Sequence, residues 1–142
     1  MQQPIQLTVP SGAKTVDRYD AESFTVSGDV IAGDILITPA LVRPICSVTM
    51  AALTPESFAE VFALSPKPNV LLFGTGAVHL FVAPAIRQYF RTQGIGLETM
   101  DTGSAVRTYN ILLAEGRDIA GLFLKNSLLA KSSCALKATH FT

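Results

Sequence analysis

The second half of the chain constrains the fold more than any other feature, because short apolar segments alternate there with segments of helical spacing. In order, these segments are residues 69–73, 84–93, 95–100, 103–115 and 118–124. The two helical segments end at Gly94 and Gly116, which are typical helix-terminating residues. Strands joined through helices of this length form right-handed crossovers, so we expect three parallel strands in one sheet.

Both expected helices have an apolar face that can pack on such a sheet. In residues 84–93 the inward-facing side chains are expected to be Ile86, Tyr89 and Phe90. Thr102 is the expected N-cap of the second helix. The apolar face of that second helix is predicted to be Ala105, Val106, Tyr109, Leu112 and Leu113.

The first half of the chain is rich in short β-forming segments. They are residues 5–9, 24–27, 30–32 and 35–38. The intervening sequences SGDV and AGDI predict tight turns between antiparallel strands. A helix is then predicted to begin at Thr54-Pro55-Glu56, with a buried stripe of Phe58, Val61 and Phe62.

These patterns predict one α/β domain over residues 1–124, within a chain of 142 residues. The expected architecture is a three-layer β+α/β/α sandwich. Its central sheet is mixed and mostly parallel, and an antiparallel β unit lies at the N-terminal side. For the tail, residues 125–142, disorder and a docked terminal helix are both compatible with the sequence.

The composition favours a protein partner over a nucleic acid. Only 15% of residues are charged against 49% hydrophobic, and globular proteins average about 25% charged. This surplus indicates either an unusually large core or an exposed apolar patch, and such a patch would favour binding of another protein or of a second copy of the chain. The 11 basic and 11 acidic residues cancel, and no basic stripe is present, so nucleic-acid binding is not expected.

The sequence predicts a cytoplasmic, bacterial-type protein. Residues 1–20 show neither a signal peptide nor the arginine-rich character of a transit peptide. The longest uncharged stretch, residues 68–86, is interrupted by proline and glycine, so no membrane span is expected. Cys46 and Cys134 are far apart and lack metal-ligand spacing, which favours two reduced thiols and no metal site.

The glycine turn after residues 69–73 resembles the start of a dinucleotide-binding loop, but it departs from that pattern. His79 occupies the third glycine position, and the next helix begins only at Pro84. No cofactor is therefore predicted. Gly74 and Gly76 still indicate a sharp turn at the carboxyl end of a strand, where ligands collect in open α/β sheets.

Residues that follow the next strand are expected to meet this turn in one crevice. Thr75 and Thr102 are the expected points of convergence. Arg107 and Asn110 share one side of the helix that follows. Either they fasten that helix to a neighbouring loop, or they contact an anion or carbonyl group of a ligand. Glu115 and Arg117 are expected to form a helix-end ion pair, or to contact the glycine loop.

No catalytic set can be assembled from the sequence. The two histidines are His79 and His140, and no nucleophile elbow or metalloprotease motif is present. His79 lies between apolar neighbours, which favours a structural role over that of a general base. No catalytic residue and no metal ligand are therefore predicted.

The ordered combination of these features resembles a known family. It consists of Gly74-Thr75-Gly76, Gly94-Ile95 with Glu98, Met100 with Thr102 and Ala105, Thr108-Tyr109-Asn110, and Ala114-Glu115-Gly116-Arg117. Residues 25–124 are similar to the small α/β domain of the mitochondrial complex I assembly factor 3 family and its bacterial and archaeal relatives, a domain of unknown function. The resemblance implies a three-layer fold and a partner-binding role during assembly, with no established reaction or cofactor.

The resemblance also makes a set of residues candidates for a binding pocket or for specifying the fold. They are Gly74, Thr75, Gly76, Thr102, Arg107, Tyr109, Asn110, Glu115 and Arg117. The function predicted from the sequence is a non-enzymatic protein-interaction or assembly module. The alternative is a protein or enzyme that binds a small anion or metabolite in the crevice between Gly74–Gly76 and Thr102–Asn110.

Overall fold

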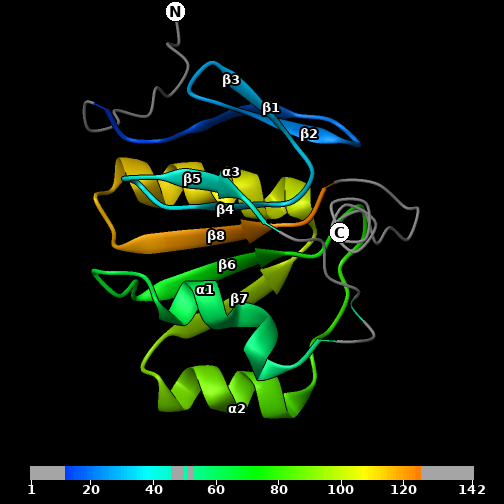
Figure 1. Cartoon of the computed structure of the whole chain (residues 1–142), viewed down its shortest axis with the longest axis vertical. Coiled ribbons are helices and arrows are strands. Elements are labelled where there is room, and N and C mark those ends of the chain that lie inside the picture. The colour runs from blue at the N-terminus through cyan, green and yellow to red at the C-terminus, as the bar shows by residue number, and fades with distance from the viewer. Residues whose placement is uncertain (1–11, 46–49, 51–52, 126–142) are drawn as a thin grey trace, which may run out of the picture.

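The computed structural model describes residues 12–45, 50 and 53–125, and these residues form three stacked layers (Figure 1). A five-stranded sheet is the middle layer. Two helices cover one of its faces, and a third helix together with a three-stranded sheet covers the other. The predicted strand at residues 5–9, both cysteines, His140 and residues 126–142 lie outside the described residues.

The central sheet is mixed, as predicted. Its strand order is β5-β4-β8-β6-β7. The strands span Val42–Pro44 (β5), Ile35–Ile37 (β4), Ile119–Phe123 (β8), Val70–Gly74 (β6) and Gly96–Met100 (β7). β6 is parallel to both β7 and β8, whereas β4 is antiparallel to β8 and β5. The expected trio of neighbouring parallel strands is confirmed.

The outer layers follow from the connections between the strands. A 3₁₀ turn (Pro55–Phe58) leads into α1 (Ala59–Phe62), and α2 (Pro84–Thr92) connects β6 to β7. These elements cover one face. α3 (Thr102–Ala114) connects β7 to β8 and covers the other face, beside an antiparallel sheet of β1 (Val16–Tyr19), β2 (Ser23–Val26) and β3 (Asp29–Ala32).

Each face of the central sheet has its own apolar core. On the α1–α2 side, Phe58 stacks edge-on against Phe73 and Phe90, with ring centroids 5.4 and 5.0 Å apart. On the α3 side, Phe123 contacts Phe24 of β2 and Tyr109 of α3. Because β4, β6 and β8 alternate buried side chains between the two cores, these strands are apolar along almost their whole length.

The prediction of two hairpin turns is right for the first turn and wrong for the second. Ser27 and Gly28 adopt positive φ angles of 49° and 92° and join antiparallel β2 and β3. Gly33, at φ 87°, instead leads the chain from the outer sheet into the central one. The reason is burial: all three residues of β4 are buried, which requires a layer on each side, while β3 is largely exposed.

Two details of the predicted helices are wrong. The N-cap of α3 is Asp101, whose side chain accepts from Ser104 N–H, and Thr102 is the first helical residue. The Thr102 hydroxyl does not cap α3, because it is hydrogen-bonded to Gly76 and Leu124 instead. Tyr89 does not face inward like Ile86: it is 39% exposed and packs at the surface against Phe62.

Candidate functional site

The parallel strands end where α3 begins, and hydrogen bonds join their ends into one unit. Thr75 N–H donates to Met100 C=O of β7 at 2.9 Å, and Leu124 N–H donates to Gly74 C=O at 2.9 Å. The predicted meeting of the glycine turn with the start of α3 is therefore observed. Thr75 and Thr102, the two residues predicted to converge, lie beside each other at this end of the sheet.

Thr102 links the strand ends to one another through its hydroxyl group. Its side chain is fully buried, and its hydroxyl accepts from Gly76 N–H at 2.9 Å while donating to Leu124 C=O at 2.7 Å. Thr102 N–H in turn donates to Gly76 C=O at 2.8 Å. These amide and hydroxyl groups, which could otherwise bind an anion, already have partners within the chain.

The glycine turn is required by close packing and by backbone conformation. A Cβ atom at Gly74 would lie 2.9 Å from Thr102 Cα and 3.2 Å from Ala105 Cβ, so only glycine lets α3 approach β6 this closely. Gly76 has φ 105°, a conformation that other residues rarely adopt. Thus both glycines have a structural explanation that involves no phosphate group.

Thr75 organises the loop of residues 75–83 that connects β6 to α2. Its buried hydroxyl accepts from Leu80 N–H at 3.0 Å and donates to Val78 C=O at 2.7 Å. The loop is thereby folded back on its own first residue. It presents apolar side chains outward, and we call Val78, Leu80 and Phe81 the apolar loop patch.

The apolar loop patch is a feature that the residue-by-residue reasoning missed. Val78 is 50% exposed, Leu80 39% and Phe81 81%. Its signal in the sequence is an apolar connection of neither helical nor alternating periodicity. Such a run is indistinguishable from a buried strand until the fold shows that both faces of the sheet are already covered.

His79 lies on the same loop and points to the edge strand. Its Nε2 is 3.1 Å from Thr99 Oγ1, and its ring centroid is 4.8 Å from that of Phe81. The same Thr99 oxygen accepts from Arg87 Nη2 at 2.9 Å. None of the described contacts brings a carboxylate to His79, so the pairing that would orient it as a general base is not seen.

Two predicted pocket residues on α3 attach the outer sheet to the domain. Asn110 forms a bidentate contact with Val16 of β1, accepting from its N–H at 3.2 Å and donating to its C=O at 2.9 Å. Tyr109 is buried and its hydroxyl donates to Lys14 C=O at 3.0 Å. Burial raises the pKa of the Tyr109 hydroxyl, so this donor keeps its proton.

Arg107 lies at the surface and belongs to the cap of α3. Its Nη2 donates to Ser104 Oγ at 3.2 Å, and Ser104 Oγ donates to Asp101 Oδ1 at 2.7 Å. The hydrogen bond from the Ser104 hydroxyl is the main reason that the pKa of Asp101 is lowered, and Arg107 adds a smaller effect in the same direction. Arg107 therefore contacts the N-terminal turn of its own helix, and both its fastening to a neighbouring loop and its ligand binding stay predictions.

The remaining two candidates lie at the far end of α3. Glu115 and Arg117 form the expected ion pair, with 3.6 Å between Oε1 and Nη1. Thirteen helical residues separate the two ends of α3 by about 18 Å, so this pair is remote from the glycine turn. Gly74, Thr75, Gly76 and Thr102 therefore meet at one place, and the other five candidates do not join them.

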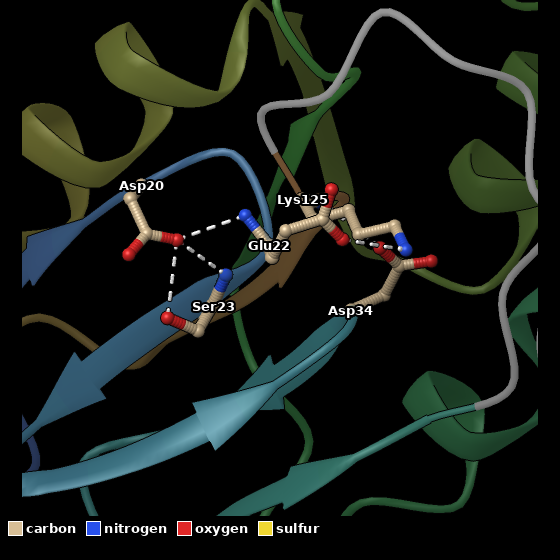
Figure 2. Close-up of polar contacts among 5 residues, drawn as sticks. All are labelled: Asp20, Glu22, Ser23, Asp34 and Lys125. Atoms are coloured by element: carbon tan, nitrogen blue, oxygen red, sulfur yellow. Dashed lines mark hydrogen bonds and ion pairs between the residues drawn. The ribbon is translucent and has the colours of Figure 1, made fainter.

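A second polar cluster binds the end of the described chain to both sheets (Figure 2). Buried Asp34, which precedes β4, accepts from Lys125 N–H at 2.7 Å. Lys125 Nζ lies 3.3 Å from Oε1 of Glu22, in the turn between β1 and β2 of the outer sheet. This contact joins residues that are more than 90 positions apart in sequence, which no local pattern could predict.

Asp20 shapes the turn between β1 and β2 in the same region. One of its carboxylate oxygens accepts from Glu22 N–H, Ser23 N–H and Ser23 Oγ at 2.8, 2.9 and 3.1 Å (Figure 2). The bond from Glu22 N–H is the largest of the effects that lower the pKa of Asp20. These contacts are all local, so Asp20 has a structural role in this turn.

Within residues 12–45, 50 and 53–125, no group of three or more histidine, cysteine, aspartate and glutamate side chains has the proximity needed to hold a metal ion. Across the same residues, every helix is too short or too polar to cross a bilayer.

Comparisons with known proteins agree with this architecture. The family model described as "Protein of unknown function (DUF498/DUF598)" matches residues 16–124. A mouse relative named NADH dehydrogenase [ubiquinone] 1 alpha subcomplex assembly factor 3 is 31% identical over 102 residues, or 72% of this chain and 55% of the relative. An uncharacterized protein of Rhodobacter capsulatus is 30% identical over 80% of this chain and 86% of its own length.

Among solved structures, one described as an outer membrane protein from Bartonella henselae is 33% identical with a TM-score of 0.72, and covers 83% of this chain and 98% of that one. The chain spans little more than half the length of the mouse assembly factor, whereas it matches nearly all of the bacterial structure. The similarity is therefore to the whole α/β domain.

Proposed function

This chain belongs to the DUF498/DUF598 family, and on that premise we propose that it is a non-enzymatic interaction module that assists the assembly of an NADH dehydrogenase complex. Support comes from relatives that are named as assembly factors of that enzyme and that match this chain across its α/β domain. Because they are longer than this chain, the step of assembly that it serves is part of the proposal.

The observation that carries the proposal is the apolar loop patch. Phe81 is a large aromatic side chain with 81% of its surface exposed, beside two further exposed aliphatic residues on a loop that buried Thr75 holds in place. Aromatic residues on a fixed surface are the usual anchors of protein interfaces. A loop ordered in this way also loses little conformational entropy when a partner covers it.

A non-enzymatic role fits the way in which polar groups are used at the sheet ends. Gly76 N–H, Thr75 N–H and the Thr102 hydroxyl all bond within the chain. An enzyme built at this position would need such donors directed toward a substrate. The proposed recognition site therefore lies on the outside of the loop and not at the strand ends.

In the host from which the chain comes, the gene that encodes the chain is deleted. The deletion strain is complemented with wild type, Phe81→Asp or Val30→Asp, and assembled NADH dehydrogenase is measured on native gels. Val30 is 69% exposed on the outer sheet, so it is a matched control for placing a charge on an exposed apolar site. We expect wild type and Val30→Asp to restore the complex and Phe81→Asp to fail. Normal complex in the deletion strain would refute the proposal.

The small-ligand alternative makes a separate prediction. If Arg107 holds an anion, Arg107→Ala abolishes ligand binding and leaves thermal stability nearly unchanged, because the side chain is exposed. Self-association and a cytoplasmic location likewise stay predictions. Sedimentation of the purified chain and fractionation of its host measure them directly.

A further inference from the structure

The strand at one border of the central sheet, β7, has the features of a binding site. β7 pairs with β6 on one side, and no other strand among the described residues pairs with it. Gly96 N–H and Met100 C=O point to β6 and its loop, as their hydrogen bonds show. Strand alternation then directs the backbone N–H and C=O groups of Leu97 and Thr99 outward, where an added strand can pair with them.

Cations line the α2 side of this border. Arg87 and Arg91 of α2 line, together with residues 94–97, an open surface hollow of about 380 Å³. Their side-chain hydrogen bonds go to neutral groups, Thr99 and Gln88 respectively, and the ion pairs of the described residues do not include either arginine. Lys67 lies nearby, with Nζ 2.7 Å from Gln93 C=O.

The spacing of the two arginines fits an extended chain. Residues four apart on a helix are separated by about 6 Å along its axis, and alternate residues of a strand by about 6.6 Å. Side chains at every second position of an added strand point to the same face. Two acidic side chains at such positions can therefore pair with Arg87 and Arg91 simultaneously.

We propose that β7 binds an extended acidic segment of a partner protein by strand addition, with its carboxylates on Arg87 and Arg91. The proposal rests on the interaction role proposed above and names the chemistry of the partner. The site continues into the apolar loop patch, because His79 beside Phe81 contacts Thr99 of β7. An apolar residue that follows the acidic segment can thus cover Phe81.

A second copy of the chain fits this border less well than an acidic segment. A two-fold antiparallel pairing centred on β7 places Glu98, its middle residue, opposite Glu98 of the copy. Like charges directly opposite each other destabilise a strand pair. The arginines would also remain without acidic partners in such a dimer.

The test is an NMR titration of the isotope-labelled chain with a capped heptapeptide of alternating threonine and glutamate. A peptide with lysine in place of glutamate is the control. We expect saturable shifts at the Leu97 and Thr99 amides with the acidic peptide alone. Arg87→Gln combined with Arg91→Gln should weaken binding about tenfold, as expected for two partly exposed charge pairs. Arg107→Gln, on the other side of the sheet, should not change it.

A second pair of variants separates backbone pairing from charge attraction. Thr99→Pro removes the outward N–H of the edge strand, and Thr99→Val removes only the hydroxyl. Strand addition predicts that proline abolishes peptide binding and that valine retains it, with folding of both checked by circular dichroism. An equal response to the lysine peptide, shifts away from β7, or no binding at millimolar peptide would overturn the proposal.

The two proposals can fail separately. If the titration fails but Phe81→Asp still blocks complex assembly, the interaction role stands and the partner binds elsewhere. If the peptide binds β7 while the deletion strain assembles its NADH dehydrogenase normally, strand addition stands and the assembly role is wrong. Dimerisation of the free chain through β7 would replace the acidic segment with a second copy.

Discussion

Replacing Thr102 with valine tests whether its hydroxyl holds the strand ends together. Valine keeps the shape of threonine and removes the hydroxyl, so Gly76 N–H and Leu124 C=O lose their partner at 2.9 and 2.7 Å. The site is fully buried, so water cannot easily replace the hydroxyl. The substitution therefore leaves a buried donor and a buried acceptor unsatisfied.

The expected loss follows from those two groups. Each unsatisfied buried polar group costs about 1–3 kcal/mol, and the added methyl group recovers about 1 kcal/mol by burial. We expect Thr102→Val to lower the free energy of unfolding by about 1–5 kcal/mol. For a domain of this size the melting temperature should fall by roughly 10 °C.

Urea unfolding followed by far-UV circular dichroism measures this difference. The matched control is Thr108→Val on the same helix, whose half-buried hydroxyl donates to Met100 Sδ at 3.7 Å. Sulfur is a weak acceptor, so we expect a change below about 0.5 kcal/mol in the control. Equal stability of Thr102→Val and wild type would show that the hydroxyl does not hold the strand ends together.

Three further predictions concern neighbouring contacts. Gly74→Ala should destabilise the fold by about 1–3 kcal/mol in urea unfolding, because the new Cβ would lie 2.9 Å from the α3 backbone; wild-type stability would contradict this packing. Asn110→Ala should speed hydrogen exchange in β1, because Val16 loses both side-chain contacts; unchanged exchange would show that the outer sheet is held otherwise. Ser104→Ala should raise the pKa of Asp101 toward 3.8 in an NMR titration. The lowered pKa of wild-type Asp101 contributes stability above pH 3.8 that is lost as the pH falls, so the variant's deficit should shrink in acid.

Much of the central layer follows from local pattern. Residues 69–124 carry strands and helices of ordinary length with clear terminators, and Gly94 and Gly116 both adopt φ 75° as the helix ends require. The parallel trio and its convergence on α3 then follow from connection handedness. This part could be predicted because each element has a clear local signal in its own sequence.

The strands in the first half of the chain are harder to predict, because they are short and some of their contacts lie far away in sequence. β1 carries two charged residues, Asp17 and Arg18, and its edge is fixed by Asn110 of α3. β5 ends in proline, and among the strands that the structure describes it pairs with β4 alone. Neither strand has an alternating pattern strong enough to be recognised alone.

The candidate site divides in the same way. The meeting of the glycine turn with Thr102 could be expected, since carboxyl ends of parallel strands share one border. The sequence could not show that the Thr102 hydroxyl has partners on both sides, nor that Phe81 is exposed. Both facts depend on which surfaces the remaining layers cover.

The most direct test of the account is a photo-crosslinking residue at position 81 in growing cells. If the apolar loop patch receives a partner during assembly, position 81 should crosslink to a subunit of NADH dehydrogenase, and position 30 on the outer sheet should not. Crosslinks from position 30 alone, or none from position 81 while the complex is being assembled, would contradict it.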